Sequence, residues 1–356
     1  MISLLITHKK EYYISMKRKI LVTGGCGYIG SHTVIDLIEE GFDVFSIDNY
    51  QNSSPETLDQ IEEVTGTRIK NYEIDLRDRN ALMNALSQEG KIDGLIHFAA
   101  LKAVGESVEK PLLYYDNNIN GLLNILEAQR KFKIAHHIFS SSCSVYGNAD
   151  DLPVTESSPV KEAESPYART KQISEDIIRD FSVPYDQFQF ILLRYFNPAG
   201  AHESGLIGES PINPPANLIP VITETAYGLR ETMTVFGDDY DTRDGSCVRD
   251  YIHIMDLARA HTLSLKYLLE GKAQEPVEIF NVGTGDGVTV LEAIRAFEKE
   301  TGLSLDYEIG DRRPGDVIAI FANNDKAEKL LGWKPSRDIR AIMKTAWDWE
   351  IKRRKS

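Results

Sequence analysis

The sequence predicts an α/β protein with a doubly wound parallel sheet and a smaller carboxyl-terminal α/β lobe. Two observations lead to this prediction. Short apolar strands alternate with helix-like segments through the first half of the chain. A glycine-rich turn follows the first of these strands directly and opens a helix. The 356 residues, of which 42% are hydrophobic, are enough for two lobes.

The individual elements follow from the pattern in chain order. KILVT (19–23) and DVFSID (43–48) are compact strands, and the helical repeat of SHTVIDLIEEG (31–41) lies between them. Further strands and helices alternate after them, over residues 69–75, 76–88, 95–100, 117–132 and 136–142. Ligands of such sheets lie at the carboxyl ends of the strands. Side chains at those ends are therefore candidate site residues, namely Asp75, Phe98, Ala99, Ser140 and Ser142.

Charge and cysteine content narrow the class of protein. A net charge of −14 and a pI of about 5.1 argue against nucleic acid or an anionic membrane surface as the main partner. Cys26, Cys143 and Cys247 show neither disulfide-like nor metal-ligand spacing, which fits reduced thiols in a cytoplasmic protein. The histidines form no metal-binding pattern, and no apolar run approaches the roughly 20 residues that span a bilayer. Residues 1–16 are expected to be a non-native or disordered extension.

The turn GGCGYIG is suited to a dinucleotide. Gly24, Gly27 and Gly30 let the backbone turn tightly, so that a pyrophosphate can approach the amino terminus of the next helix. Asp48 ends the second strand, where a carboxylate can accept hydrogen bonds from an adenine-ribose diol and would repel a 2′-phosphate. Asn49 and Tyr50 follow it rather than an arginine, so the pattern favours NAD over NADP.

The segment AESPYARTKQ (163–172) places Tyr167 and Lys171 four residues apart, just after a proline that suits a helix start. A free tyrosine titrates near pH 10, and a neighbouring ammonium is expected to lower that pKa. The pair could therefore be a tuned acid/base. The same spacing also occurs on ordinary solvated helix faces.

Eight motifs occur together and in a fixed order. They are TGGCGYIG, FAALKAVGES, YYDNNINGLLNILEA, FSSSCSVYG, SPYARTK, LRYFNPAGA, VRDYIHIMDLA and RRPGD. In combination they resemble the extended short-chain dehydrogenase/reductase family and, more narrowly, its UDP-glucose 4-epimerases. The resemblance runs from about Lys19 to Trp349.

The resemblance implies a role for each motif residue. Tyr167 would be the acid/base, Ser142 would hydrogen-bond the same sugar oxygen, and Lys171 would hold the nicotinamide ribose. The implied NAD contacts are Gly24, Gly27, Tyr28, Ile29, Gly30, Asp48, Asn49, Asp75, Leu76, Phe98, Ala99, Lys102, Asn117, Ser140, Tyr167, Lys171 and Tyr195. The implied substrate contacts are Ser142, Tyr167, Asn197, Asn217, Leu218, Phe236, Arg249, Tyr251, Arg313 and Asp316, with Ile320 setting the size of the sugar pocket.

The resemblance also implies an activity and an organisation. A UDP-sugar would be oxidised at C4 by retained NAD, turn over as the 4-ketone, and receive the hydride on its opposite face. Residues 17–196 would form an NAD-binding Rossmann domain and residues 197–356 mainly the UDP-sugar lobe, with the chain able to cross back to the first domain. Helices over 120–132 and 167–181 would pair in a homodimer.

Three alternatives stay open at this point. A sugar-nucleotide 4,6-dehydratase shares the first oxidation, but its elimination needs an additional acid and base. Dehydratases carry Thr-Asp-Glu where this chain has Ser142-Cys143-Ser144. An epimerase for UDP-N-acetylglucosamine or a UDP-pentose is compatible with Ile320, which is intermediate between the tyrosine that excludes an N-acetyl group and the cysteine that admits one. A non-catalytic NAD-sensing protein would not need Ser142, Tyr167 and Lys171 intact.

Overall fold

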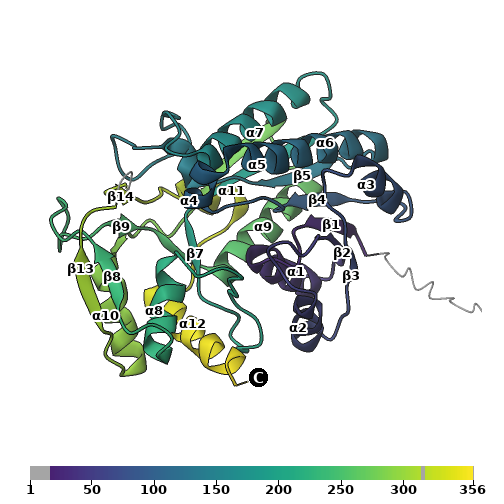
Figure 1. The fold of residues 1–356 in the computed structure, drawn as a ribbon. Coiled ribbons are helices and arrows are strands. Elements are labelled where there is room, and N and C mark those ends of the chain that lie inside the picture. The colour runs from purple at the N-terminus through teal and green to yellow at the C-terminus, as the bar shows by residue number, and fades with distance from the viewer. Residues whose placement is uncertain (1–16, 314–316, 356) are drawn as a thin grey trace, which may run out of the picture.

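The computed structural model describes residues 17–313 and 317–355 (Figure 1). The expected extension over residues 1–16 and the predicted contact Asp316 therefore lie outside the described residues. A seven-stranded parallel sheet forms the centre of the larger lobe, in the order β11-β6-β5-β4-β1-β2-β3. Its strands are β1 (Lys19–Thr23), β2 (Asp43–Ile47), β3 (Lys70–Tyr72), β4 (Gly94–His97), β5 (His136–Ser140), β6 (Gln189–Tyr195) and β11 (Val277–Val282).

The strand order reverses at β1, which determines where a ligand can bind. Ile20 of β1 is in register with Val44 of β2 on one side and with Gly94 of β4 on the other. The chain winds outward from this position in both directions, so the carboxyl ends of β1 and β4 border a crevice. The doubly wound sheet predicted from the sequence is confirmed.

Helices cover both faces of this sheet (Figure 1). One layer consists of α1 (Tyr28–Glu39), α2 (Glu56–Thr65) and α9 (Ile254–Leu269). The other contains α3 (Arg79–Leu86), α4 (Val104–Glu109), α5 (Pro111–Tyr115), the π-type turn η1 (Asp116–Asn120), α6 (Gly121–Phe132) and α7 (Pro166–Ser182). Strands covered on both faces need mainly apolar side chains, which explains Ile20–Val22 in β1 and Leu95 and Ile96 in β4.

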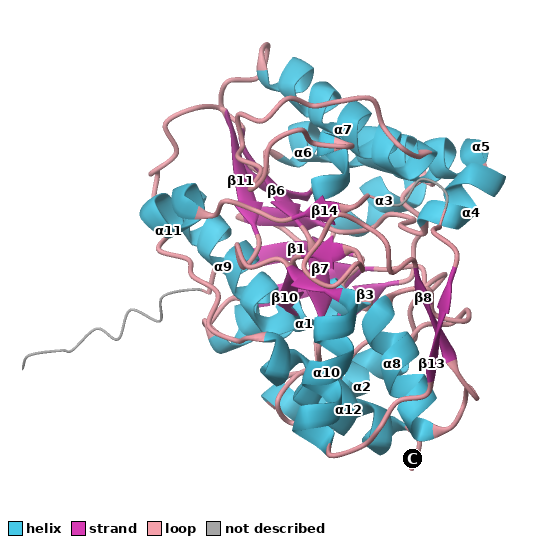
Figure 2. Ribbon diagram, turned by 90° about the vertical axis from the view of Figure 1, so that its left-hand side faces the viewer, coloured by secondary structure: helices cyan, strands magenta, loops and turns pink. Residues whose placement is uncertain are grey.

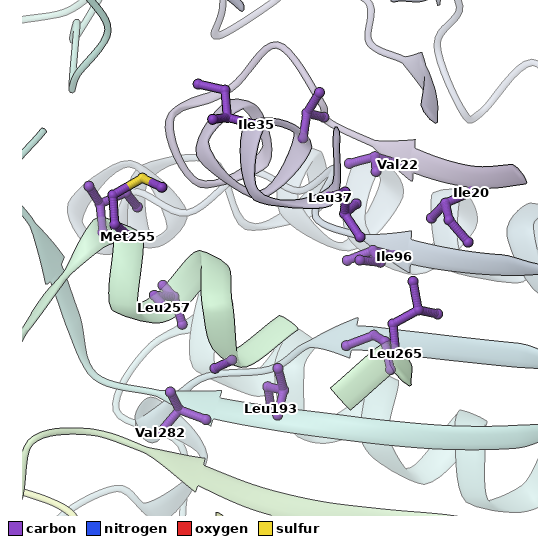
Figure 3. Close-up of a cluster of buried hydrophobic side chains, with 14 of the residues drawn as sticks. Ile20, Val22, Ile35, Leu37, Ile96, Leu193, Met255, Leu257, Leu265 and Val282 are labelled. Atoms are coloured by element: carbon purple, nitrogen blue, oxygen red, sulfur yellow. The ribbon is translucent and has the colours of Figure 1, made fainter. Parts of the chain in front are cut away.

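The main core lies between the sheet and the layer of α1 and α9 (Figure 3). Val22 of β1 and Ile96 of β4 lie beside Leu37 of α1 in this cluster, and Leu193 of β6 lies near α9, which contributes Leu257 and Leu265. All of these side chains are fully buried. Burying one such side chain contributes about 1.5–3 kcal/mol. This packing holds the carboxyl ends of the strands in fixed relative positions.

The described part of the smaller lobe combines short strand pairs and triplets with helices (Figure 2). The strands are β7 (Asn197–Ala199) with β10 (Tyr251–His253), β8 (Met233–Phe236) with β13 (Tyr307–Gly310), and β9 (Val248–Arg249) with β12 (Val288–Thr289) and β14 (Ala319–Ile320). The helices are α8 (Leu218–Tyr227), α10 (Val290–Thr301) and α12 (Ile339–Arg353), which bury a separate apolar cluster. Helix α10 begins at a capping box, in which Thr289 and Glu292 satisfy each other's backbone amides.

The chain returns to the large sheet after β10. Helix α9 packs against β4, β5 and β6, strand β11 adds to the edge at β6, and α11 (Asp325–Leu331) packs on β11. The predicted division between residues 196 and 197 stays a prediction. In the part of the chain that the structure describes, no helix combines the length and apolar character needed to cross a lipid bilayer.

We predict that acid destabilises this fold between pH 6.5 and 4. Burial lowers the pKa of His32, His253 and His261 from 6.5 to about 4 and that of His137 to about 3, and it lowers the pKa of His97 well below its usual value. The unfolded chain binds protons below pH 6.5 while these buried rings stay neutral, so each histidine lowers the free energy of unfolding by about 1.4 kcal/mol per pH unit in that window. Urea unfolding from pH 7.5 to 4.5 measures the slope. A free energy of unfolding independent of pH over this window would contradict the prediction.

Candidate active site

The glycine turn lies at the carboxyl end of β1. Gly24 has φ +71°, a left-handed conformation that favours glycine, and its amide donates to the carbonyl of Ile47 at 2.8 Å. A Cβ on Gly30 would lie 2.1 Å from the carbonyl oxygen of Gly24, so only glycine permits the turn to close on α1. Gly27 precedes α1, whose first turn has neither a capping side chain nor an acidic residue among the described residues. The amino terminus of α1 is therefore available to a pyrophosphate, and the turn fits a dinucleotide.

Asp48 is fixed at the end of β2, next to this turn. Its Oδ2 accepts the amide of Cys26 at 3.0 Å, and its Oδ1 accepts the amide of Tyr50 at 2.9 Å and the hydroxyl of Ser53 at 2.7 Å. A carboxylate has about four acceptor positions, so one remains for a ribose hydroxyl. The position fits the expected adenine-ribose contact.

Asn49 and Asp75, two further predicted cofactor residues, come together at the ends of β2 and β3. Arg77 pairs with the Asp75 carboxylate at 2.6 Å (Nη2 to Oδ2). The pKa of Asp75 is lowered mainly by its hydrogen bond with the Arg77 guanidinium, and the nearby Asn49 side chain also helps to lower it. Leu76, the next residue, is buried beneath Gly121.

Strand β4 completes the nucleotide edge. The amide of Phe98 donates to the carbonyl of Thr23 at 3.1 Å, and the backbone of Ala99 lies so close to Gly24 that a Cβ there would be 2.9 Å from the Ala99 nitrogen. The remaining predicted cofactor positions in this region are Tyr28 and Ile29 in the first turn of α1, Lys102 after β4, and Asn117 in η1. All of them lie on elements that follow the carboxyl ends of β1 and β4.

Lys171 is the central buried cation of the site. Helix α7 begins at Pro166, with Ser165 as its N-cap accepting the amide of Ala168 at 3.1 Å. One turn into this helix, Lys171 is 5% exposed and donates from Nζ to the carbonyl of Ser140 at 2.6 Å. Burial lowers the pKa of Lys171 to about 8. An ammonium has three donors, so two remain for the hydroxyls of a ribose.

Tyr167 stands between Lys171 and Ser142. The Lys171 nitrogen lies 6.0 Å from the centroid of the Tyr167 ring. Loss of water around the Tyr167 hydroxyl raises its pKa well above 10, the Tyr195 hydroxyl adds to this increase, and the nearby Ser142 side chain opposes it. The sequence led us to expect a lowered pKa. Without a bound cofactor, the desolvation that raises the pKa of Tyr167 outweighs the stabilisation of its phenolate by the Lys171 ammonium.

Ser140 and Tyr195 connect the two strands beneath the pair. The hydroxyl of Ser140 at the end of β5 hydrogen-bonds the hydroxyl of Tyr195 at the end of β6. Ser142 begins the 3-10 turn η2 (Cys143–Tyr146) and accepts the amide of Ser144 at 3.2 Å. The structure thus brings Ser140, Ser142, Tyr167, Lys171 and Tyr195 into one cluster, which we name the reacting end after the role that the resemblance implies for Ser142, Tyr167 and Lys171.

The predicted substrate residues occupy the smaller lobe in pairs. Asn197 of β7 is in register with Tyr251 of β10, and Arg249 of β9 is in register with Ile320 of β14. Ile320 is 7% exposed and packs in an apolar cluster with Phe196. The positive charge of Arg249 opposes the rise in pKa that burial causes at Cys143. Because Cys143 follows Ser142 directly, this interaction places the Arg249–Ile320 pair near the reacting end.

A third pair lies where β8 and β13 end. The guanidinium of Arg313 lies 4.3 Å from the centroid of the half-exposed Phe236 ring. Asn217 precedes α8 as its N-cap residue, and Leu218 is the first residue of that helix. An aromatic face, a cation and a helix amino terminus are groups that suit a nucleobase and a diphosphate.

Sequence reasoning missed two carboxylates that hold this region together. Asp250 accepts the amide and hydroxyl of Thr284 at 2.7 and 2.6 Å and the amides of Gly285 and Ala322 at 3.2 and 3.1 Å. Glu209 accepts the side-chain amide of Asn217 at 3.2 Å and lies 3.6 Å from the Lys102 nitrogen. Glu209 therefore joins a predicted substrate contact to a predicted cofactor contact. Asp250 lies within the VRDYIHIMDLA motif, but the partners that define its role, Thr284, Gly285 and Ala322, lie far along the chain, and Glu209 belongs to none of the eight motifs.

With this geometry in view, comparisons with known proteins give a consistent result. A family model described as GDP-mannose 4,6 dehydratase matches residues 21–346. The UDP-glucose 4-epimerase 2 of Arabidopsis thaliana is 48% identical over 94% of this chain and 95% of its own length. The UDP-glucose 4-epimerase of Bacillus subtilis is 45% identical over 93% of this chain and 96% of its own length. The chain belongs to the UDP-glucose 4-epimerase branch of the extended short-chain dehydrogenase/reductase family.

Solved structures of this epimerase family agree. The chain is similar to the UDP-glucose 4-epimerase from Bifidobacterium longum in complex with NAD⁺ and UDP, with a TM-score of 0.89 and 46% identity over 94% of this chain and 98% of that one. It is also similar to the enzyme from Stenotrophomonas maltophila with bound NAD and formylated UDP-arabinopyranose. That likeness has a TM-score of 0.91 and 43% identity over 95% of this chain and 99% of that one.

We predict that Gly30→Ala abolishes NAD binding because the added Cβ would lie 2.1 Å from the Gly24 carbonyl oxygen and open the turn. Gly105→Ala is the matched control, since a Cβ at that helical position has no atom within 4 Å and the φ angle is not positive. The NAD content per purified chain compares the two variants with wild type, and circular dichroism confirms that both are folded. NAD binding by folded Gly30→Ala as strong as in wild type would contradict the assignment.

Proposed function

We propose that the protein interconverts UDP-galactose and UDP-glucose by inverting C4, with NAD retained in the site. The observation that carries this proposal is the cluster of Ser142, Tyr167 and Lys171 at the carboxyl edge of a sheet whose glycine turn fits a dinucleotide. Family membership supports it, because the curated relatives are named UDP-glucose 4-epimerase. The intact cluster also argues against a protein that only senses NAD.

Within this proposal, each residue of the cluster has a separate task. Tyr167 takes the proton of the C4 hydroxyl and later returns one to the ketone oxygen, while Ser142 hydrogen-bonds the same oxygen and keeps it in place. Below about pH 8 Lys171 is charged and favours the phenolate of Tyr167. Bound NAD⁺ would accept and return the hydride at C4 and add a positive charge beside Tyr167. This further cation would oppose the desolvation that raises the pKa of Tyr167.

Inversion also requires that the sugar moves while the nucleotide stays. Arg249 and Arg313 are proposed to hold the diphosphate, because a planar guanidinium can contact two phosphate oxygens at once. Phe236 would support the uracil, and Asn217 and Leu218 at the start of α8 would hold the diphosphate and base. Asn197 and Tyr251 would contact the sugar end. The 4-ketone can then turn over without dissociation of the UDP part.

The dehydratase alternative lacks its additional catalysts. The family model that matches carries a dehydratase name, but the segment after β5 is Ser142-Cys143-Ser144 and contributes no carboxylate. The match reflects a shared fold and a shared first oxidation rather than the elimination step. Among epimerase substrates, we propose a strong preference for UDP-glucose and UDP-galactose. The buried Ile320 would restrict an N-acetyl group.

We further propose a cytoplasmic homodimer with an NAD-binding lobe over residues 17–196 and a UDP-sugar lobe mainly over residues 197–356. The three free cysteines support a reducing compartment. Helices α6 and α7 lie beside each other in the same helix layer (Figure 1). Leu123 of α6 is 43% exposed, and an exposed apolar side chain on this layer supports pairing with a second copy. Light scattering that gave the mass of one chain would contradict the dimer.

We predict that the purified protein converts UDP-galactose to UDP-glucose without added NAD, since the cofactor stays in the site and is back in its oxidised form after each turnover. Chromatographic separation of the two sugars measures the product, and UDP-N-acetylglucosamine serves as a comparison substrate. Absence of conversion even with added NAD would contradict the proposed function, and comparable turnover of the N-acetylated sugar would contradict the proposed preference.

We also predict that Tyr167→Phe lowers kcat by about 10²–10⁴-fold, the range typical of a lost general acid/base, while its nucleotide binding stays intact.

A further inference from the structure

The middle serine of the FSSS segment has a different environment from its neighbours. Ser140 and Ser142 belong to the reacting cluster, whereas Ser141 is fully buried. The hydroxyl of Ser141 donates to Oε1 of Glu175 at 2.6 Å. This hydrogen bond joins the end of β5 to helix α7 behind the reacting residues.

Glu175 is a buried carboxylate with an unusually complete set of partners. Its Oε1 also accepts Nε of Arg194 at 2.9 Å, and its Oε2 accepts Nη2 of Arg194 at 2.6 Å and Nη2 of Arg179 at 2.9 Å. The side chains of Glu175 and Arg194 are each 2% exposed. Burying such a pair is costly, and apolar residues of similar volume are often no less stable, so stability alone does not account for the pair.

The positions of Ser141, Glu175 and Arg194, which we name the Glu175 cluster, suggest its role. Each member adjoins a residue of the reacting end: Ser141 lies between Ser140 and Ser142, Glu175 lies one helical turn after Lys171, and Arg194 directly precedes Tyr195. The cluster therefore contacts β5, α7 and β6 at the points where these elements deliver the acid/base and its partners. The charge of Glu175 also opposes the effect of burial on the pKa of Lys171.

We propose that Glu175, held by Arg194, is a positioning residue for the epimerase reaction and fixes Ser140 and Ser142 relative to Tyr167 and Lys171 through its hydrogen bond with Ser141. The inference rests on the proposed function. Proton transfer requires heavy atoms within hydrogen-bond reach, so a small displacement of Ser142 affects the chemical step more than substrate binding. The residues proposed to hold the UDP part lie in the smaller lobe.

The test compares Ser141→Ala with Arg179→Ala, because each removes one hydrogen-bond donor to Glu175. Arg179 approaches from the surface, with 41% of its side chain exposed, and touches no residue of the reacting end in the described contacts. We expect Ser141→Ala to lower kcat by about tenfold, as small misplacements in active sites do, with KM for UDP-galactose and the NAD content per chain close to wild type. Arg179→Ala should keep the wild-type kcat.

Each outcome supports or overturns the inference. A wild-type kcat in NAD-loaded Ser141→Ala would overturn it. Equal losses of kcat in Ser141→Ala and Arg179→Ala that parallel a fall in melting temperature would also overturn it, because the loss would then reflect stability alone. If Ser141→Ala does not fold, Ser141→Cys keeps the volume with a weaker donor, and a wild-type kcat there would likewise overturn it. If wild-type protein does not convert UDP-galactose, the proposed function fails first and the inference fails with it.

Discussion

The arrangement of the site depends on one buried hydrogen bond, between the ammonium of Lys171 and the carbonyl oxygen of Ser140. An ammonium that leaves water loses hydration, and only a close partner and a fixed geometry offset that cost. The Ser140 carbonyl and the face of the Phe139 ring, 4.9 Å from the Lys171 nitrogen, supply this environment. Because Lys171 belongs to α7 and Ser140 ends β5, the contact fixes the helix against the edge of the sheet. Tyr167, one turn earlier, is thereby held beside Ser142.

The smaller lobe has its site segments tied together by side-chain carboxylates rather than by the contact of one helix with the sheet. Its predicted substrate residues lie on short strands and helix ends, which are held by side chains that do not belong to the predicted site. Asp250 ties the segment of Arg249 and Tyr251 to the loops around Thr284 and Ala322. Glu209 connects Asn217 with Lys102 across the two lobes. Such tethers would suit a site that grips the nucleotide part of a UDP-sugar and leaves the sugar free to turn.

The same fold serves more than one reaction, and local chemistry distinguishes them. A family model with a dehydratase name covers residues 21–346, while the curated relatives with 45–48% identity are named epimerases. The sheet and the glycine turn support oxidation of a sugar in either case. The residues after β5 decide the fate of the oxidised sugar, because elimination needs an additional acid and base that Cys143 and Ser144 do not provide.

The sequence by itself determined the features that depend on local spacing. The alternation of strands and helices, the glycine turn and the Tyr167–Lys171 spacing act within a few residues, and the doubly wound sheet formed as expected. Only the tertiary structure revealed Glu209, Asp250 and the pairing of Glu175 with Arg194, because their partners lie far along the chain. It also reversed the expected shift in the pKa of Tyr167. Desolvation is a property of the packed surroundings, and no sequence spacing records how much water a side chain loses.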